Sequence, residues 1–261
     1  MSFSGKSPGS TYKDLLYVDN NNSGVSATAK QIKTAEGSST VAKLSDRSLT
    51  LKPTADNDSV VKLSNASGAI KFQVDTSAND VKALGTHVNT QYAYFGIGAD
   101  AQALLAANTH YGIPFFGMVN KISTWDVDFG TGTDPDTSFT TANTVSQYGS
   151  QLAGMLWYVP DNITIDAVYS IEGGDANATD TTRMHLYSYT YNSGSTSALA
   201  DGTLLAHNSD VTNEGNTKTY KSTWTIDSAN VSGGKVICAF FRSDSINSDY
   251  TTNITVKYHL T

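Results

Sequence analysis

Apolar and polar residues alternate with a period of two in short segments over much of the chain. In the first third the alternation covers residues 48–53, 60–64 and 69–75, separated by turn signals rich in Asn, Ser and Gly. This pattern predicts short, half-buried β-strands. Each strand has only two or three apolar residues on one face, which is too little area to offset the conformational entropy of folding. We therefore expect residues 41–90 to form a repetitive β stalk that needs other copies of the chain to close its core. A flexible, partly disordered region is the alternative.

Residues 1–40 are poor in aromatic residues and contain one short segment with an apolar face. Within that segment the best candidates for anchoring contacts are Tyr12, Leu15, Leu16 and Val18. An Asn-rich turn signal follows at residues 19–24. We expect residues 1–40 to act as an attachment segment.

The composition changes at about residue 91, where aromatic residues become frequent. Residues 100–107 form the only good helix window in the chain, and Asp100 stands near the position of an N-cap. We expect a short helix there, within a junction over residues 91–115.

The strand signals are stronger from residue 116 onward. They cover residues 154–160, 162–171, 183–191, 219–226, 235–242 and 253–260. The alternation in residues 162–171 predicts that Ile163, Ile165, Ala167, Tyr169 and Ile171 share one face. The loops between the strands are longer than hairpin turns, so some connections must cross between sheets. Residues 116–261 are therefore expected to form an antiparallel, jelly-roll-like β-sandwich, and the fold class of the whole chain is all-β.

The composition excludes several classes of function. Charged residues make up 16% of the 261 residues, against about a quarter in an average globular chain, and the net charge is −7. Nucleic-acid binding relies on clustered Lys and Arg, which are absent here. No stretch approaches the ~20 apolar residues of a membrane span. The single cysteine, Cys238, lies in an apolar run and is expected to be a small buried residue.

No arrangement of residues predicts catalysis, a cofactor or a metal. The five histidines match no zinc-binding spacing, and neither a nucleophile elbow nor a phosphate-binding loop is found. The acidic pairs Asp126 with Asp128 and Asp134 with Asp136 could hold Ca²⁺ or serve glycan cleavage. Their spacing is not that of an EF-hand, so a solvated acidic loop is the preferred interpretation.

Three tyrosines, Tyr187, Tyr189 and Tyr191, alternate along one predicted strand and share a face. Tyrosine can stack on sugar rings and hydrogen-bond through its hydroxyl, and it also fills subunit interfaces well. Glycan contact and a subunit interface are thus two interpretations. A face packed within the fold is the third.

The stalk sequence ASGAIKFQVDTSANDV, over residues 66–81, resembles an element of fibre and spike proteins of tailed bacteriophages. The preceding LTLKP at residues 49–53 fits the same resemblance. The opening STYKDLL at residues 10–16, with its Asn-rich turn, is similar to N-terminal segments of phage virion proteins.

The resemblance implies a homotrimeric, non-enzymatic virion protein. Residues 1–40 would attach to capsid or tail proteins, the stalk would be built by three chains, and the head would face outward. We expect the head to adhere to host or surface glycans, because weak single sites gain avidity when displayed in multiple copies. Assembly would take place in the host cytoplasm, because the chain begins without an apolar export signal. A capsid decoration protein without a receptor is the alternative, and a glycan depolymerase ranks last.

Overall fold

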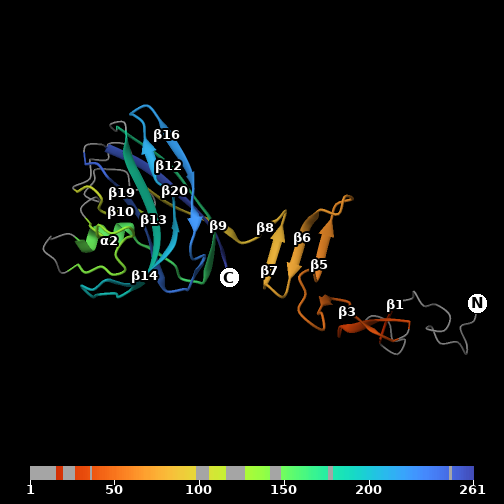
Figure 1. Cartoon of the computed structure of the whole chain (residues 1–261). Coiled ribbons are helices and arrows are strands. Elements are labelled where there is room, and N and C mark those ends of the chain that lie inside the picture. The colour runs from red at the N-terminus through yellow and green to blue at the C-terminus, as the bar shows by residue number, and fades with distance from the viewer. Residues whose placement is uncertain are drawn as a thin grey trace, which may run out of the picture. The chain divides into compact units, whose positions relative to one another are not determined.

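The computed structural model describes residues 16–19, 27–35, 37–97, 106–115, 127–141, 148–175, 179–246 and 249–261. It is 56% strand and 3% helix, with antiparallel sheets, so the predicted all-β class is confirmed. The chain divides into two compact units, Met1–Val88 and Asn89–Thr261 (Figure 1). Of the helix predicted over residues 100–107, all but the last two residues lie outside the described ranges.

The first unit contains two four-stranded antiparallel sheets in which each strand pairs with the next in sequence. The first sheet consists of β1 (Leu16–Val18), β2 (Lys30–Thr34), β3 (Ser39–Leu44) and β4 (Leu49–Leu51). The second consists of β5 (Val61–Ser64), β6 (Ile70–Asp75), β7 (Asp80–Ala83) and β8 (Thr86–His87). The strands expected over residues 48–53, 60–64 and 69–75 are β4, β5 and β6.

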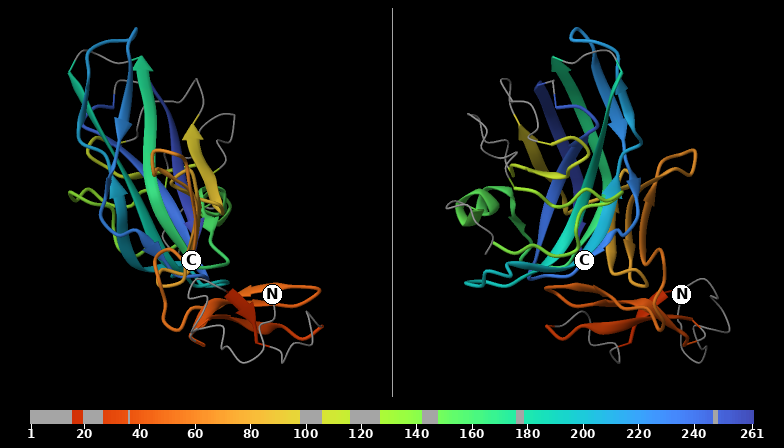
Figure 2. Two further views of the ribbon diagram at one scale, coloured as in Figure 1. Left: turned by 90° about the vertical axis from the view of Figure 1, so that its right-hand side faces the viewer. Right: turned by 60° about the vertical axis from the view of Figure 1, so that its left-hand side comes forward.

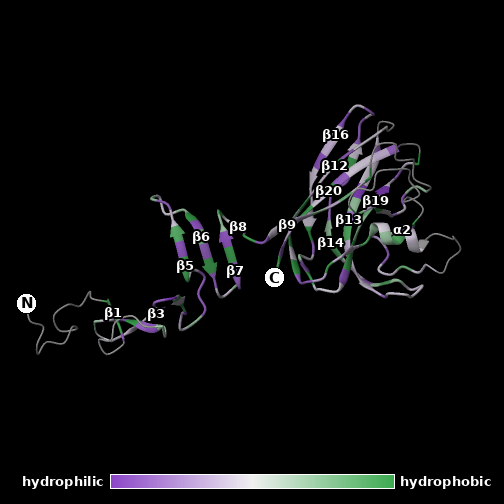
Figure 3. Ribbon diagram, turned by 180° about the vertical axis from the view of Figure 1, so that it is seen from behind, coloured by the Kyte–Doolittle hydropathy of each residue, from purple (hydrophilic) through white to green (hydrophobic). Residues whose placement is uncertain are grey.

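The three longer strands of the second sheet have one apolar face. Two rows of three residues, Val61–Val74–Val81 and Leu63–Phe72–Ala83, lie in register across β5, β6 and β7, so these six residues share a face. The opposite face carries Lys62, Gln73 and Lys82. Apolar and polar residues both occur along these strands in the hydropathy view (Figure 3). Among the described residues of the first unit, only Ala35 and Ser45 are buried.

The second unit is a β-sandwich. Its main strands are β9 (Thr90–Ile97), β10 (Tyr111–Ile113), β12 (Ile163–Asp175), β13 (Asp180–Tyr191), β14 (Leu199–His207), β16 (Thr219–Thr223), β19 (Lys235–Ser243) and β20 (Asp249–Leu260). Shorter strands are β11 (Trp157–Tyr158), β15 (Val211–Asn213), β17 (Thr225–Ile226) and β18 (Asn230–Val231). The five-stranded sheet has the order β16-β12-β20-β9, with β18 also paired to β12. The seven-stranded sheet has the order β10-β19-β13-β14-β17, with β11 also paired to β19 and β15 to β13.

This strand order is that of a jelly roll. Numbered along the chain, the eight main strands fall in the orders 1-8-3-6 and 2-7-4-5 in the two sheets, which is the double Greek-key arrangement. The first two of these strands, β9 and β10, come from residues 91–115. The described parts of that segment, residues 91–97 and 106–115, therefore belong to the second unit, and their assignment to a junction is wrong.

The main core lies between the two sheets. It contains Phe95 from β9, Val168 from β12, Leu186 from β13 and Phe241 from β19, all 1% exposed or less. The face predicted for residues 162–171 is only half correct. Ile163 and Ile165 point into this core, but a β-bulge between Ile165 and Ala167 changes the phase. Val168 and the residues two and four further on then point inward.

A second core covers the outer face of the seven-stranded sheet. Residues 127–141, which we call the cover segment, and the helix α2 (Tyr148–Met155) pack over β13 and β19. Figure 2 shows α2 outside the sandwich. Cys238 is fully buried in this core, as expected. Residues 148–155 are helical although the sequence predicted a strand from residue 154, because Gly149 and Gly154 hide the helix signal.

Candidate functional site

The outer face of the seven-stranded sheet changes from buried and apolar to partly exposed and charged along β13. Tyr189, Tyr187, His185 and Arg183 occupy alternate positions and therefore share this face. The two tyrosines lie under the cover segment, His185 is fully buried at its edge, and Arg183 is half-buried beyond it. The same strand thus runs from an apolar core, through a histidine, to an open charged cleft.

Tyr187 and Tyr189 are not surface residues. Their exposed fractions are 4% and 0%, and the Tyr189 hydroxyl donates a 2.8 Å hydrogen bond to the Asp136 carbonyl of the cover segment. Burial raises the pKa of Tyr187 to about 12. The packed-face interpretation therefore holds for these two, and glycan or subunit contact is wrong for them. Tyr191 is 41% exposed at the end of the strand.

Three histidines form a row beside the tyrosines. The ring of His185 lies 4.9 Å from that of His110 and 6.3 Å from that of His207. Nδ1 of His207 donates a 2.7 Å hydrogen bond to the Asp227 carboxylate, whereas neither ring nitrogen of His185 has a hydrogen-bond partner. Burial lowers the pKa of His185 to about 3 and that of His110 to about 4, so both rings are neutral near pH 7.

An open cleft of about 210 Å³ lies beyond His185 along β13, at Arg183. We call it the arginine cleft, and it is lined by Asn108, Thr181, Thr182, Arg183, Asp210, Arg242 and Asp244. Arg183 on β13 and Arg242 on β19 are register partners, so two positive side chains stand directly opposite each other. Like charges in this position destabilise an antiparallel pair.

Each arginine has a different local environment. Arg242 donates to the Asn108 carbonyl at 3.3 Å and to its Oδ1 at 2.9 Å, which fixes the guanidinium plane. Asn108 has a φ of 58°, a left-handed conformation that Asn tolerates better than most residues. Arg183 lies 3.5 Å from a carboxylate oxygen of Asp210, and its buried Nε has no hydrogen-bond partner. Asp210 is itself largely exposed.

The acidic residues predicted as a calcium loop do not converge. Asp126 lies outside the described residues. Asp134 points to His185, with 3.4 Å between its Oδ1 and the ring Nε2. Asp128 accepts a 2.6 Å hydrogen bond from the Gly130 amide. Burial raises the pKa of Asp136, and the nearby negative charge of Asp128 raises it further. The described carboxylates serve the local structure of the cover segment.

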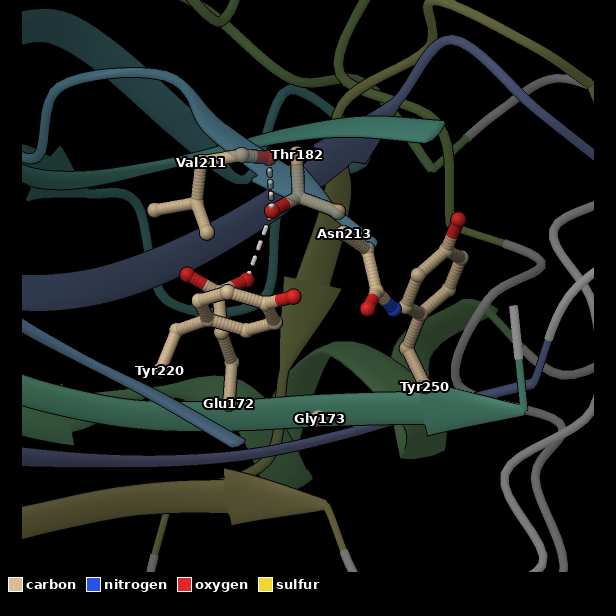
Figure 4. A pocket seen from close by; sticks show the side chains of 7 residues that line it. All are labelled: Glu172, Gly173, Thr182, Val211, Asn213, Tyr220 and Tyr250. Carbon is tan, nitrogen blue, oxygen red and sulfur yellow. Dashed lines mark hydrogen bonds between the residues drawn. The ribbon is translucent and has the colours of Figure 1, made fainter. Parts of the chain in front are cut away.

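A buried carboxyl group lies on the inner side of the same end of the sandwich (Figure 4). Glu172 of β12 is 4% exposed, and Thr182 of β13 donates a 2.6 Å hydrogen bond to its Oε2. The other oxygen, Oε1, is buried without a hydrogen-bond partner. Burial raises the pKa of Glu172 to about 7. Val211, Asn213, Tyr220 and Tyr250 close the pocket around it.

The exposed tyrosines lie on the other sheet. We call Tyr92, Tyr94, Tyr169 and Ile171 the tyrosine patch; these residues are 37–54% exposed on the outer face of the five-stranded sheet. Tyr94, Thr255 and Tyr169 are aligned in register across β9, β20 and β12. Sequence analysis missed this patch because the bulge in β12 turns Tyr169 and Ile171 outward.

The anchor residues of the N-terminal segment are only partly described. Tyr12 and Leu15 lie outside the described residues. Leu16 is 61% exposed, and Val18 pairs with Ile32 of β2. A docking role for this segment stays a prediction.

Comparison with known proteins shows no matching family model and no matching curated protein. Among solved structures, an aminopeptidase from a marine sediment archaeon, Thaumarchaeota archaeon, matches with a TM-score of 0.31 and 9% identity. The match covers 72% of this chain and 40% of that chain. No helix within the described residues is long and apolar enough to cross a membrane.

Proposed function

We propose that this protein is a structural appendage of a bacteriophage particle: a homotrimeric fibre or spike with a jelly-roll head that adheres to host or surface glycans. The observation that carries the proposal is the apolar face of the sheet formed by β5, β6 and β7, on which none of the six apolar residues is buried. Supporting it are the sequence resemblance of residues 66–81 to phage fibres and the jelly-roll strand order of the head, a topology shared by viral capsid and lectin domains.

The described residues of the first unit form almost no interior of their own. Six apolar residues share one face of the sheet, none of them is buried, and Leu63 is 59% exposed. A single-layered sheet gains stability only when a second layer covers its apolar side. Three copies of the same chain, each supplying one such sheet, would bury three apolar faces against one another. Leu49 and Leu84 of this unit are also exposed, at 61% and 75%, so they too need a second layer to cover them.

The head offers surfaces suited to weak, repeated binding. The tyrosine patch combines aromatic rings with hydroxyl groups, and the arginine cleft is lined entirely by polar and charged side chains. Weak individual sites gain avidity when several copies act together on one particle. This arrangement favours adhesion, with capsid decoration as the competing role.

Light scattering of the purified full chain tests the oligomeric part. We expect a mass three times that of the 27.8 kDa chain at micromolar concentration. A monomer under these conditions contradicts the trimeric stalk.

The virion part needs a separate experiment. Mass spectrometry of purified particles from cells that produce the chain should find it at a constant copy number per particle. Detection only in the cell lysate contradicts the assignment. Removal of residues 1–40 then separates the two roles: an adhesin retains cell binding through its head, whereas a decoration protein loses particle binding and shows no cell binding.

A further inference from the structure

We propose that the arginine cleft binds the carboxylate of an acidic sugar, with Arg183 and Arg242 as the two groups that hold it. This inference rests on the proposed function in one respect, since it names the class of glycan that the head would recognise. The cleft is formed entirely by described residues of the second unit.

The use of arginine in the chain is selective. The sequence contains three arginines and 14 lysines, and two of the three arginines are register partners in this cleft. Lysine would give the same charge, but only arginine presents a planar fork that matches a carboxylate with two parallel hydrogen bonds. Two guanidinium groups placed side by side repel each other unless an anion lies between them.

The two guanidinium groups differ in how firmly their hydrogen bonds hold them. Asn108 holds Arg242 in a fixed orientation through two contacts. Arg183 is under-satisfied, because its Nε has no partner and its contact with Asp210 is long at 3.5 Å. Of the two acids in the cleft, Asp244 already accepts a 2.7 Å hydrogen bond from the Thr181 amide. Asp210, which is exposed and makes only the long contact with Arg183, is the group that a ligand carboxylate would displace.

The size and lining of the cleft suit a sugar. Sites for drug-sized ligands usually occupy about 300–1,000 Å³, so a cleft of about 210 Å³ fits one sugar ring. The hydroxyl of Thr181 and the amide of Asn108 can exchange hydrogen bonds with ring hydroxyls. We expect a dissociation constant of order 1 mM for a single ring, which multivalent display would strengthen.

Arginine side-chain NMR tests this directly, because the full chain has only three arginine Nε–H groups. Glucuronate, glucose and inorganic sulfate are the probes, added separately to the ¹⁵N-arginine-labelled protein. We expect glucuronate to shift the Arg183 and Arg242 signals in a saturable way while the Arg47 signal stays in place. Glucose should shift none of them. Equal saturable binding of sulfate, or equal shifts of all three arginines, overturns the acidic-sugar assignment.

Two variants make the assignment specific. Arg242→Gln should weaken glucuronate binding at least tenfold. Asp210→Asn should instead strengthen it several-fold, because it removes the competing carboxylate while keeping a polar side chain. Arg47→Gln, in the first unit, is the matched control and should leave the affinity unchanged. Unchanged or weaker binding by Asp210→Asn contradicts the displacement. The oligomeric mass of the same samples tests the proposed function separately. A trimer that does not bind glucuronate therefore contradicts only the sugar site.

Discussion

Thr182 on β13 donates a 2.6 Å hydrogen bond to Glu172 on β12, and this contact joins the inner faces of the two sheets at one end of the sandwich. The bond satisfies one carboxyl oxygen and leaves the other buried without a hydrogen-bond partner. A proton on that carboxyl removes the cost of burying a charge. The stability of the head should therefore depend on the protonation of Glu172.

The first prediction is a loss of stability with rising pH. The pKa of Glu172 is about 7 in the fold against 4.5 ordinarily, so the folded head holds the extra proton between these values. This proton contributes about 3 kcal/mol to the free energy of unfolding. The contribution is complete below pH 4.5 and is lost as the pH rises through 7. Glu172→Gln should match the original protein near pH 4 and be more stable at pH 8. Urea denaturation followed by tryptophan fluorescence measures this, since all three tryptophans belong to the second unit.

Glu214→Gln is the control for that series. Glu214 is an exposed carboxylate paired with Lys218 and should leave the pH dependence unchanged. An identical pH slope in Glu172→Gln and the original protein would show that Glu172 is not the titrating group.

The second prediction concerns the apolar face of the first unit. Leu63→Asp places a charge on that face and should dissociate the trimer, because an unpaired carboxylate cannot be buried between copies. Lys62→Asp adds the same side chain one residue earlier, on the opposite face, and should leave the mass unchanged. Analytical ultracentrifugation measures the oligomeric mass of both variants. A trimer that survives Leu63→Asp would mean that another surface joins the chains.

The third prediction tests the bulge in β12. Asp166 is the extra residue, and its carboxylate lies 3.0 Å from Nδ1 of His259. Deletion of Asp166 leaves Ile165 and Val168 facing the core, so the head should still fold cooperatively at a cost of about 1 kcal/mol for the lost contact. Deletion of Val168 also removes the bulge but puts the smaller Ala167 into the fully buried position of Val168, so it should destabilise the head more than deletion of Asp166. Equal effects of the two deletions on the unfolding transition would argue against this description.

The fourth prediction concerns the docking of the cover segment. A Cβ on Gly202 would lie 2.8 Å from the Thr137 Cα and 2.6 Å from the Tyr189 ring. Gly202→Ala should therefore push the cover segment away and destabilise the head by about 1–3 kcal/mol. Gly149→Ala in α2 meets no neighbouring atom within 4 Å and should stabilise it by up to about 1 kcal/mol. In Gly202→Ala, faster hydrogen exchange of the backbone around Tyr189 would show that the cover segment has moved away from this residue.

Local patterns in the sequence determined much of this protein. Period-two alternation is a property of the strand itself, so the all-β class and most strands followed from it, as did the burial of Cys238 in its apolar run. The scarcity of apolar residues in residues 41–90 likewise follows from composition, and it anticipates a sheet without a second layer. Arginine usage, three against 14 lysines, was the only sequence signal for the cleft.

Tertiary structure decided which of these faces meets solvent. The sequence cannot tell a tyrosine face that is covered by a distant segment from one that is open, and here residues 127–141 bury Tyr187 and Tyr189. One bulge near Asp166 reverses the alternation and exposes Tyr169 on the opposite sheet. The pairing of Arg183 with Arg242, 59 positions apart in the numbering, depends on the register of two strands. These outcomes depend on contacts between segments that are remote in the chain, and such contacts leave no periodic trace in either segment.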